Sequence, residues 1–158
     1  MNYSKILAFL FVIGWMILIF MFSNQPADIS SDVSGSFAEN TINSINKISG
    51  KGLSANELER KVESFQVPVR KMGHFLEYLV LGVLVLNLLR MYPLTIKQVL
   101  ILSIVICVLY ASSDEIHQIF ISGRAGRITD VLIDALGIIT GILIYARILK
   151  KRNAFTPK

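Results

Sequence analysis

The sequence predicts an all-α membrane protein: four transmembrane helices in a compact bundle, with an amphipathic helical segment outside the membrane between the first two spans. Of its 158 residues, 53% are hydrophobic, and its mean hydropathy is +0.59. Such a composition is too apolar for a soluble domain of this length to bury in one core. The chain also contains four apolar runs close to the roughly 20 residues that a spanning helix needs. Its charges divide unequally between alternate gaps separating those runs, which is typical of a protein that crosses a membrane.

The apolar runs define four predicted spans within one domain of residues 1–158: about 5–23, 70–90, 97–121 and 127–147. No small-residue cleavage site follows the first run, so we expect a retained membrane anchor and not a signal peptide. The second and third runs reach spanning length only if their polar ends, which carry His74 and Asp114, belong to the helices. The fourth contains Gly137-x-x-x-Gly141, a pattern that lets two helices approach closely.

Residues 24–69 connect the first two spans and are predicted to be partly helical, because structureless connections of this length are uncommon. Asp28–Ser36 is rich in Ser and Asp and is expected to form a loop. Apolar side chains then recur at near-helical spacing as far as Gly50: Val33, Phe37, Ile42, Ile45 and Ile48. An amphipathic helix of this kind would lie on the bilayer or cap the bundle.

A second helix in the connecting segment is predicted to begin at Ser54. Ser54 and Glu57 fit the capping box, in which two side chains satisfy the free amides of the first turn. Three apolar residues then share one face: Leu58, Val62 and Phe65. Pro68 is expected to open the second span, because a missing amide hydrogen costs little at the start of a helix.

The lysine and arginine residues predict how the chain is oriented. One side of the membrane receives eight cations and no acid, whereas the other receives eight cations and all eleven acids. Because Lys and Arg near span ends favour the cytoplasm, both termini and the basic tail 148–158 are predicted to be cytoplasmic. The connecting segment and Gly123–Arg127 would then face outward. Beside a span, the basic tail indicates orientation and attraction to anionic lipid, and not nucleic-acid binding.

Three of the spans carry polar side chains within about two turns of their predicted outer ends. Charged side chains at this depth are costly in lipid, so they are expected to face the interior of the bundle and to meet there. The turn at Ser122–Arg127 adds guanidinium groups and exposed amides that suit a phosphate or carboxylate. The sequence therefore predicts an outward-facing polar pocket whose ligand-binding residues are Arg70, His74, Glu77, Tyr78, Asp114, Glu115, His117, Gln118, Arg124, Asp130 and Asp134.

Three functions fit such a pocket. It could bind an anionic or amphiphilic envelope ligand, such as a lipid headgroup, a wall precursor or a lipoglycopeptide. It could instead hydrolyse or transfer a group on a lipid or wall-precursor headgroup, with His74 or His117 as general base and Glu77 or Asp114 orienting it. The network could also be purely structural, as buried ion pairs often are.

Histidine and carboxylate side chains could also hold a divalent cation. The spacing of these residues is not specific for a metal, and neither a metal nor a cofactor is predicted. Because a pocket open to water keeps an orphaned charge solvated, Asp114→Asn and His117→Gln are expected to impair function more than abundance.

Four motifs resemble those of the VanZ-like family of small bacterial membrane proteins. Phe22–Pro26 is similar to the F-S-x-Q segment that closes the family's first span, and Arg70–Gly82 to its R-K-x-x-H-F-x-E-Y-x-x-L-G. Ser113–Arg124 is similar to S-D-E-x-H-Q-x-F-x-x-G-R, and Asp130–Gly141 to D-x-x-x-D-x-x-G-x-x-x-G. Together these motifs extend over nearly the whole chain.

The VanZ-like family takes its name from a protein linked to resistance against the glycopeptide antibiotic teicoplanin. The resemblance implies a multi-pass location in the bacterial plasma membrane, a function in the cell envelope and a link to glycopeptide susceptibility. It does not name a reaction, so whether the chain is an enzyme stays open.

Overall fold

The computed structural model describes residues 3–50 and 54–152, and within those ranges the chain forms five helices and no strand. They are α1 (Tyr3–Ser23), α2 (Ala27–Ser49), α3 (Ala55–Leu89), α4 (Ile96–Gln118) and α5 (Ile128–Lys151). Four of them are long and apolar enough to cross a membrane: α1, α3, α4 and α5. The predicted all-α fold with four membrane helices is confirmed.

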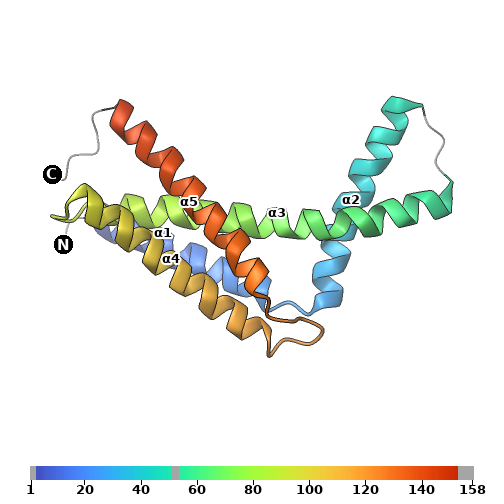
Figure 1. Ribbon diagram of the computed structural model, residues 1–158, viewed down its shortest axis with the longest axis horizontal. Coiled ribbons are helices and arrows are strands. Elements are labelled where there is room, and N and C mark those ends of the chain that lie inside the picture. The colour runs from blue at the N-terminus through green and yellow to red at the C-terminus, as the bar shows by residue number, and fades with distance from the viewer. Residues whose placement is uncertain (1–2, 51–53, 153–158) are drawn as a thin grey trace.

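Helix α3 is the central element, since it contacts each of the other four helices (Figure 1). Its 35 residues give a length of roughly 52 Å, well beyond the roughly 30 Å of bilayer hydrocarbon. The first part of α3, residues 55–69, therefore extends past the bundle. There it packs against α2, and we call α2 and residues 55–69 together the arm.

Helix α2 corrects the expectation of a loop at Asp28–Ser36, because the helix already begins at Ala27. The hydroxyl of Ser34 donates to the carbonyl oxygen of Ser30 (3.0 Å), so this serine is satisfied within the helix. The helix ends at Ser49, as predicted, and Gly50 adopts the left-handed conformation with φ 64°.

The face of α2 that meets α3 is made of small residues: Ser34, Gly35 and Ala38. Most of the apolar stripe predicted from the sequence is exposed: Val33, Phe37, Ile45 and Ile48. Small side chains let the two helices approach closely. Most of the stripe is thus not covered by α3.

Helix α3 begins with the predicted capping box. The Glu57 carboxylate accepts hydrogen bonds from the Ser54 amide (2.9 Å) and the Ser54 hydroxyl (2.7 Å). The expectation that Pro68 opens a helix is wrong, because α3 continues through it from Ala55. A proline inside a helix loses one backbone hydrogen bond. Two residues earlier, the Gln66 side chain donates to the carbonyl oxygen of Ser31 and holds α3 against α2.

The predicted apolar face of this part of α3 is shifted by one position. Leu58 and Val62 are half-buried, but Phe65 is exposed and Gln66 takes its place toward α2. The amide of Gln66 can pair with a backbone carbonyl, which an aromatic ring cannot.

Close contact between α3 and α5 forms the centre of the bundle. A Cβ atom at Gly137 or Gly141 of α5 would overlap the backbone carbonyl oxygen of Phe75 or Leu79 in α3. The Gly137-x-x-x-Gly141 pattern therefore lies at a helix contact, as its spacing suggests. Around it, α3 and α5 contribute fully buried side chains: Tyr78, Leu81, Leu86, Ile138 and Ile142.

The two ends of the bundle differ in the segments they contain (Figure 1). The end of α1, the end of α4, the start of α5 and the arm lie at one end, which we call the pocket end. The start of α1, the α3–α4 turn and the end of α5 lie at the other. Met1 and residues 153–158 of the predicted basic tail lie outside the described residues.

Candidate functional site

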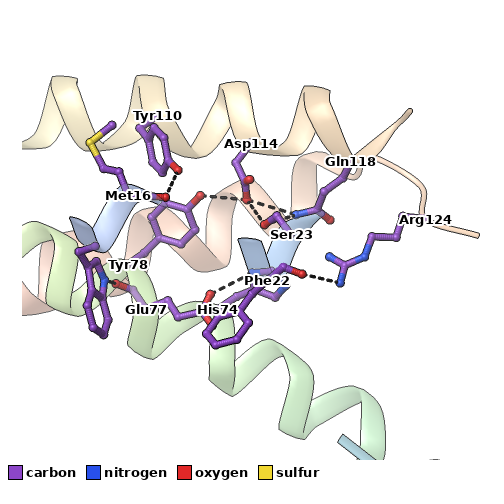
Figure 2. A network of polar contacts seen from close by, with 11 residues as sticks. Met16, Phe22, Ser23, His74, Glu77, Tyr78, Tyr110, Asp114, Gln118 and Arg124 are labelled. Carbon is purple, nitrogen blue, oxygen red and sulfur yellow. Dashed lines mark hydrogen bonds and ion pairs between the residues drawn. The ribbon is translucent and has the colours of Figure 1, made fainter. Parts of the chain in front are cut away.

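A buried carboxylate joins three helices at the pocket end. Asp114 of α4 is 4% exposed. Its Oδ2 atom accepts hydrogen bonds from Ser23 Oγ of α1 (2.7 Å), the Tyr78 hydroxyl of α3 (3.1 Å) and Gln118 Nε2 (3.2 Å), as Figure 2 shows. The Gln118 amide also lies 3.3 Å from Ser23 Oγ. Four side chains thus hold α1, α3 and α4 together around one carboxylate, and we call them the Asp114 network.

Ser23 is absent from the predicted site residues, although it belongs to the motif that closes the first span. A serine in a helix commonly bonds to the carbonyl one turn earlier, so its residue type does not reveal a distant partner. The signal that marks it is its place in that motif, at the end of α1.

A second acidic side chain, Asp134 of α5, lies 2% exposed near this network. It interacts electrostatically with carboxylates of all three polar helices: Glu115, Asp114, Asp130 and Glu77. Oδ1 of Asp114 and Oδ1 of Asp134 contact no hydrogen-bond donor within residues 3–50 and 54–152. Since a lipid-facing carboxylate at this depth is costly, its position inside the bundle is the favourable one.

Glu115 holds the loop between α4 and α5. Its Oε1 atom accepts a hydrogen bond from the backbone amide of Arg127 at 2.6 Å, although Arg127 follows it by twelve residues. The loop is compact, because a Cβ at Gly126 would come within 2.9 Å of the Glu115 carbonyl oxygen. Gly123 adopts φ 73°, a left-handed conformation that suits glycine. The buried side chain of Glu115 therefore fixes the loop that carries Arg124.

Arg124 brings a half-buried guanidinium to the pocket end. Its Nη2 atom donates to the carbonyl oxygen of Phe22 in α1 (3.3 Å) (Figure 2). Burial lowers the pKa of this guanidinium below its ordinary value, and nearby Arg70 lowers it further, whereas Asp114, Glu115 and Glu77 raise it. A guanidinium stays charged across the physiological pH range. Arg124 is therefore a fixed cation held between a second arginine and three carboxylates.

A cationic pocket of about 100 Å³ opens beside Arg124. Four of its lining residues are cations, supplied by α3 and the α4–α5 loop: Arg70, Lys71, Arg124 and Arg127. Among the described residues that line it, the acid is Asp130, whose Oδ1 lies 3.1 Å from Lys71 Nζ. His74 and Gln118 also line this pocket. Guanidinium groups bind carboxylate and phosphate oxygens through paired hydrogen bonds, so the lining suits an anion.

An apolar groove of about 280 Å³ adjoins the cationic pocket. Its walls come from the end of α1, from α2 and from α3, and include Phe22, Val33, Phe37 and Val69. Three residues line both the groove and the cationic pocket: Arg70, His74 and Arg124. Glu77 also lines the groove, with its Oε2 atom 4.0 Å from His74 Nδ1. The cationic pocket and the groove thus share a polar boundary.

The structure divides the predicted site residues into four groups. Those that line the cationic pocket are Arg70, His74, Gln118, Arg124 and Asp130, and Glu77 lines the groove. Neither space is lined by the buried residues Tyr78, Asp114, Glu115 and Asp134. His117 also lies apart from both spaces. The His117 ring stacks on Phe20 with centroids 4.7 Å apart, and its Nε2 atom is 3.3 Å from Asn24 Oδ1. His117 therefore contacts α1 and the segment that follows it.

Two cations of the pocket, Lys71 and Arg127, are not among the predicted ligand-binding residues. Lys71 follows Arg70 directly, and neighbouring residues on a helix point in different directions, so the α3 stripe excludes it. Its pairing with Asp130 of another helix brings it to the pocket. No cluster of three or more His, Cys, Asp or Glu side chains that could hold a metal ion occurs in the part of the chain that the structure describes.

Together the four apolar helices and this polar end define a multi-pass α-helical membrane protein with a site at one end of its bundle. The family model for VanZ/LLP1 matches residues 8–150, and the chain therefore belongs to the VanZ-like family. No curated protein and no solved structure gives a match to this chain. The resemblance read from the motifs is confirmed over nearly the whole sequence.

Proposed function

We propose that this chain is a cell-envelope protein whose cationic pocket binds an anionic group on the outer side of the membrane. The observation that carries the proposal is the lining of the pocket: Arg70, Lys71, Arg124 and Arg127, against one acid, Asp130. Because Asp130 pairs with Lys71, the other cations of the lining are the guanidiniums of Arg70, Arg124 and Arg127. Like charges held close together repel one another, and an anion placed between them relieves that repulsion.

The buried carboxylates support the pocket from behind. Asp114 holds α1, α3 and α4 at fixed distances, and Glu115 fixes the loop that carries Arg124 and Arg127. A binding site is most effective when its charged groups are held in place before the ligand arrives. In this proposal Asp114 and Glu115 are positioning residues and do not contact the ligand.

Binding is favoured over hydrolysis or group transfer by the residues that line the pocket. Three of the four cations there are arginines, and a guanidinium can hold an anion but stays protonated, so it cannot act as a general base.

The test uses purified full chain in phosphatidylcholine nanodiscs and glycerol 3-phosphate as the anionic probe, with uncharged glycerol for comparison. We expect glycerol 3-phosphate to bind and glycerol not to. Arg124→Gln should weaken binding about tenfold, as loss of a charge-assisted hydrogen bond would. Arg60→Gln is the matched control, because Arg60 is exposed on the arm and lines neither space. Equal affinity in all three proteins would refute the proposal.

The proposed link to glycopeptide susceptibility can be read from the same variants. If the pocket is responsible for the effect on susceptibility, bacteria that produce the Arg124→Gln protein should be as susceptible to teicoplanin as bacteria that lack the protein. Cells that produce Arg60→Gln should match those with the unsubstituted protein.

A further inference from the structure

We propose that the anionic group is the phosphate of a membrane lipid, with its hydrocarbon chain lying in the apolar groove between α1, α2 and α3. This inference rests on the proposed function and names the class of ligand. The observation behind it is that the cationic pocket and the groove share three lining residues: Arg70, His74 and Arg124. A ligand held by these residues contacts a polar space on one side and an apolar space on the other.

The charge and size of the cationic pocket suit a phosphate monoester. Such a group carries a charge of about −1.5 to −2 at neutral pH and has three acceptor oxygens. The guanidiniums of Arg70, Arg124 and Arg127 match its three oxygens in number and more than balance its charge. A water molecule needs roughly 10–15 Å³ of such space, so about 100 Å³ is large enough to hold a phosphate.

The groove has the lining that a hydrocarbon chain requires. Phe22, Val33, Phe37 and Val69 line it, and the first three have exposed side chains. Gly73 lies on the α3 wall, and a Cβ there would meet no atom within 4 Å. The missing side chain therefore leaves open space beside His74, where the groove meets the pocket.

The position of α2 in the arm places the groove beside the proposed headgroup and not in open solvent. Val33 and Phe37 belong to the exposed apolar stripe of α2. The α2 helix begins four residues after α1 ends, and the Ala27 amide donates to the Ser122 carbonyl oxygen (3.2 Å) in the α4–α5 loop. The start of α2 is thus attached at the pocket end, beside the ends of the apolar helices α1 and α4. An apolar stripe at this level suits contact with the bilayer surface.

The experiment compares three molecules that share one phosphate headgroup: glycerol 3-phosphate, dihexanoyl phosphatidic acid and dioleoyl phosphatidic acid. Binding to the full chain in zwitterionic detergent is measured by native mass spectrometry, and dioleoyl phosphatidylcholine serves as the zwitterionic comparison. We expect dioleoyl phosphatidic acid to bind at least about tenfold more tightly than the dihexanoyl lipid, because longer chains bury more methylene groups. Dioleoyl phosphatidic acid should also bind about tenfold more tightly than dioleoyl phosphatidylcholine.

A single substitution separates the groove from the pocket. Gly73→Leu fills the open space without meeting another atom at its Cβ, so it should weaken binding of dioleoyl phosphatidic acid about tenfold and leave glycerol 3-phosphate unaffected. Gly14→Leu is the matched control, since Gly14 is an exposed helical glycine of α1 whose Cβ would also meet nothing within 4 Å.

The outcomes distinguish this inference from the proposed function. If chain length and Gly73→Leu have no effect while Arg124→Gln still weakens binding of glycerol 3-phosphate, the groove is not a chain site and this inference alone falls. If Arg124→Gln changes the binding of none of the three molecules, both proposals fall. Should Gly73→Leu prove unstable, the comparison of chain lengths on the unsubstituted protein decides.

Discussion

Asp114 joins three helices through one oxygen atom, and its burial changes what a substitution there should do. The sequence favours a residue in a water-filled pocket, where Asp114→Asn impairs function more than abundance. The structure instead buries the carboxylate, with Ser23, Tyr78 and Gln118 as donors. An asparagine at this position loses the charge and points its own amide donors at groups that also donate.

We therefore expect Asp114→Asn to lower the free energy of unfolding by about 1.5–3 kcal/mol, the contribution of hydrogen bonds to a charged group. Thermal denaturation of the purified chain measures this. Asp32→Asn makes the same change at an exposed position of α2 and should leave stability unchanged. An Asp114→Asn protein as stable as the unsubstituted chain would show that the network does not support the fold.

The residues of the site are predictable from the sequence where they share a helical stripe or a motif. Arg70, His74 and Glu77 follow helical spacing, and Arg124 lies in a glycine-containing turn, so their residue types and positions indicate a polar site. The role of each residue depends on contacts between helices, which the spacing does not show. Nothing in the spacing separates Asp130, which lines the pocket, from Asp134, which lies behind it.

At the scale of the elements, the contact between α3 and α5 sets the position of the pocket. Gly137 and Gly141 lie against the backbone of Phe75 and Leu79, and backbone atoms cannot move aside as side chains do. Gly141→Ala should therefore push α5 away from α3 and destabilise the protein by about 1–3 kcal/mol. Because α5 also carries Asp130, its pairing with Lys71 should weaken.

Gly14→Ala is the control for Gly141→Ala, and its expected change in stability has the opposite sign. A Cβ at Gly14 meets no atom within 4 Å, and alanine favours a helix over glycine by about 1 kcal/mol. This variant should be as stable as the unsubstituted chain or more so, by thermal denaturation. An equal gain of stability in both variants would mean that helix propensity, and not the α3–α5 contact, decides the result.

Helix starts and ends are predictable where a local signal exists, and the arm shows where such signals fail. The Ser54 capping box and the glycine after Ser49 mark true helix ends. The expected loop at Asp28–Ser36 and the expected helix start at Pro68 are both wrong, because packing between α2 and α3 overrides the local preference. Ser34, Gly35 and Gln66 are polar or small residues that contribute to the fold through that contact.

At the scale of the whole molecule, the arrangement of the helices and the distribution of charge agree. Lys5, Arg90, Lys97 and Lys150 belong to segments at the end opposite the pocket, where α1 starts, α3 turns into α4 and α5 ends (Figure 1). The acidic residues lie toward the pocket end or on the arm. Cations near span ends favour the cytoplasm, so the pocket end is predicted to face outward.

Cysteine labelling of intact cells tests this orientation in a Cys107→Ala background, which removes the buried native thiol. Ser36→Cys on the arm and Ser122→Cys in the α4–α5 loop should react with a membrane-impermeant maleimide in intact cells. Tyr92→Cys, in the α3–α4 turn, should react only after the membrane is permeabilised. All three positions are exposed, so a difference in labelling reports the side of the membrane. The reverse pattern would place the cationic pocket in the cytoplasm, where an outer envelope ligand could not reach it.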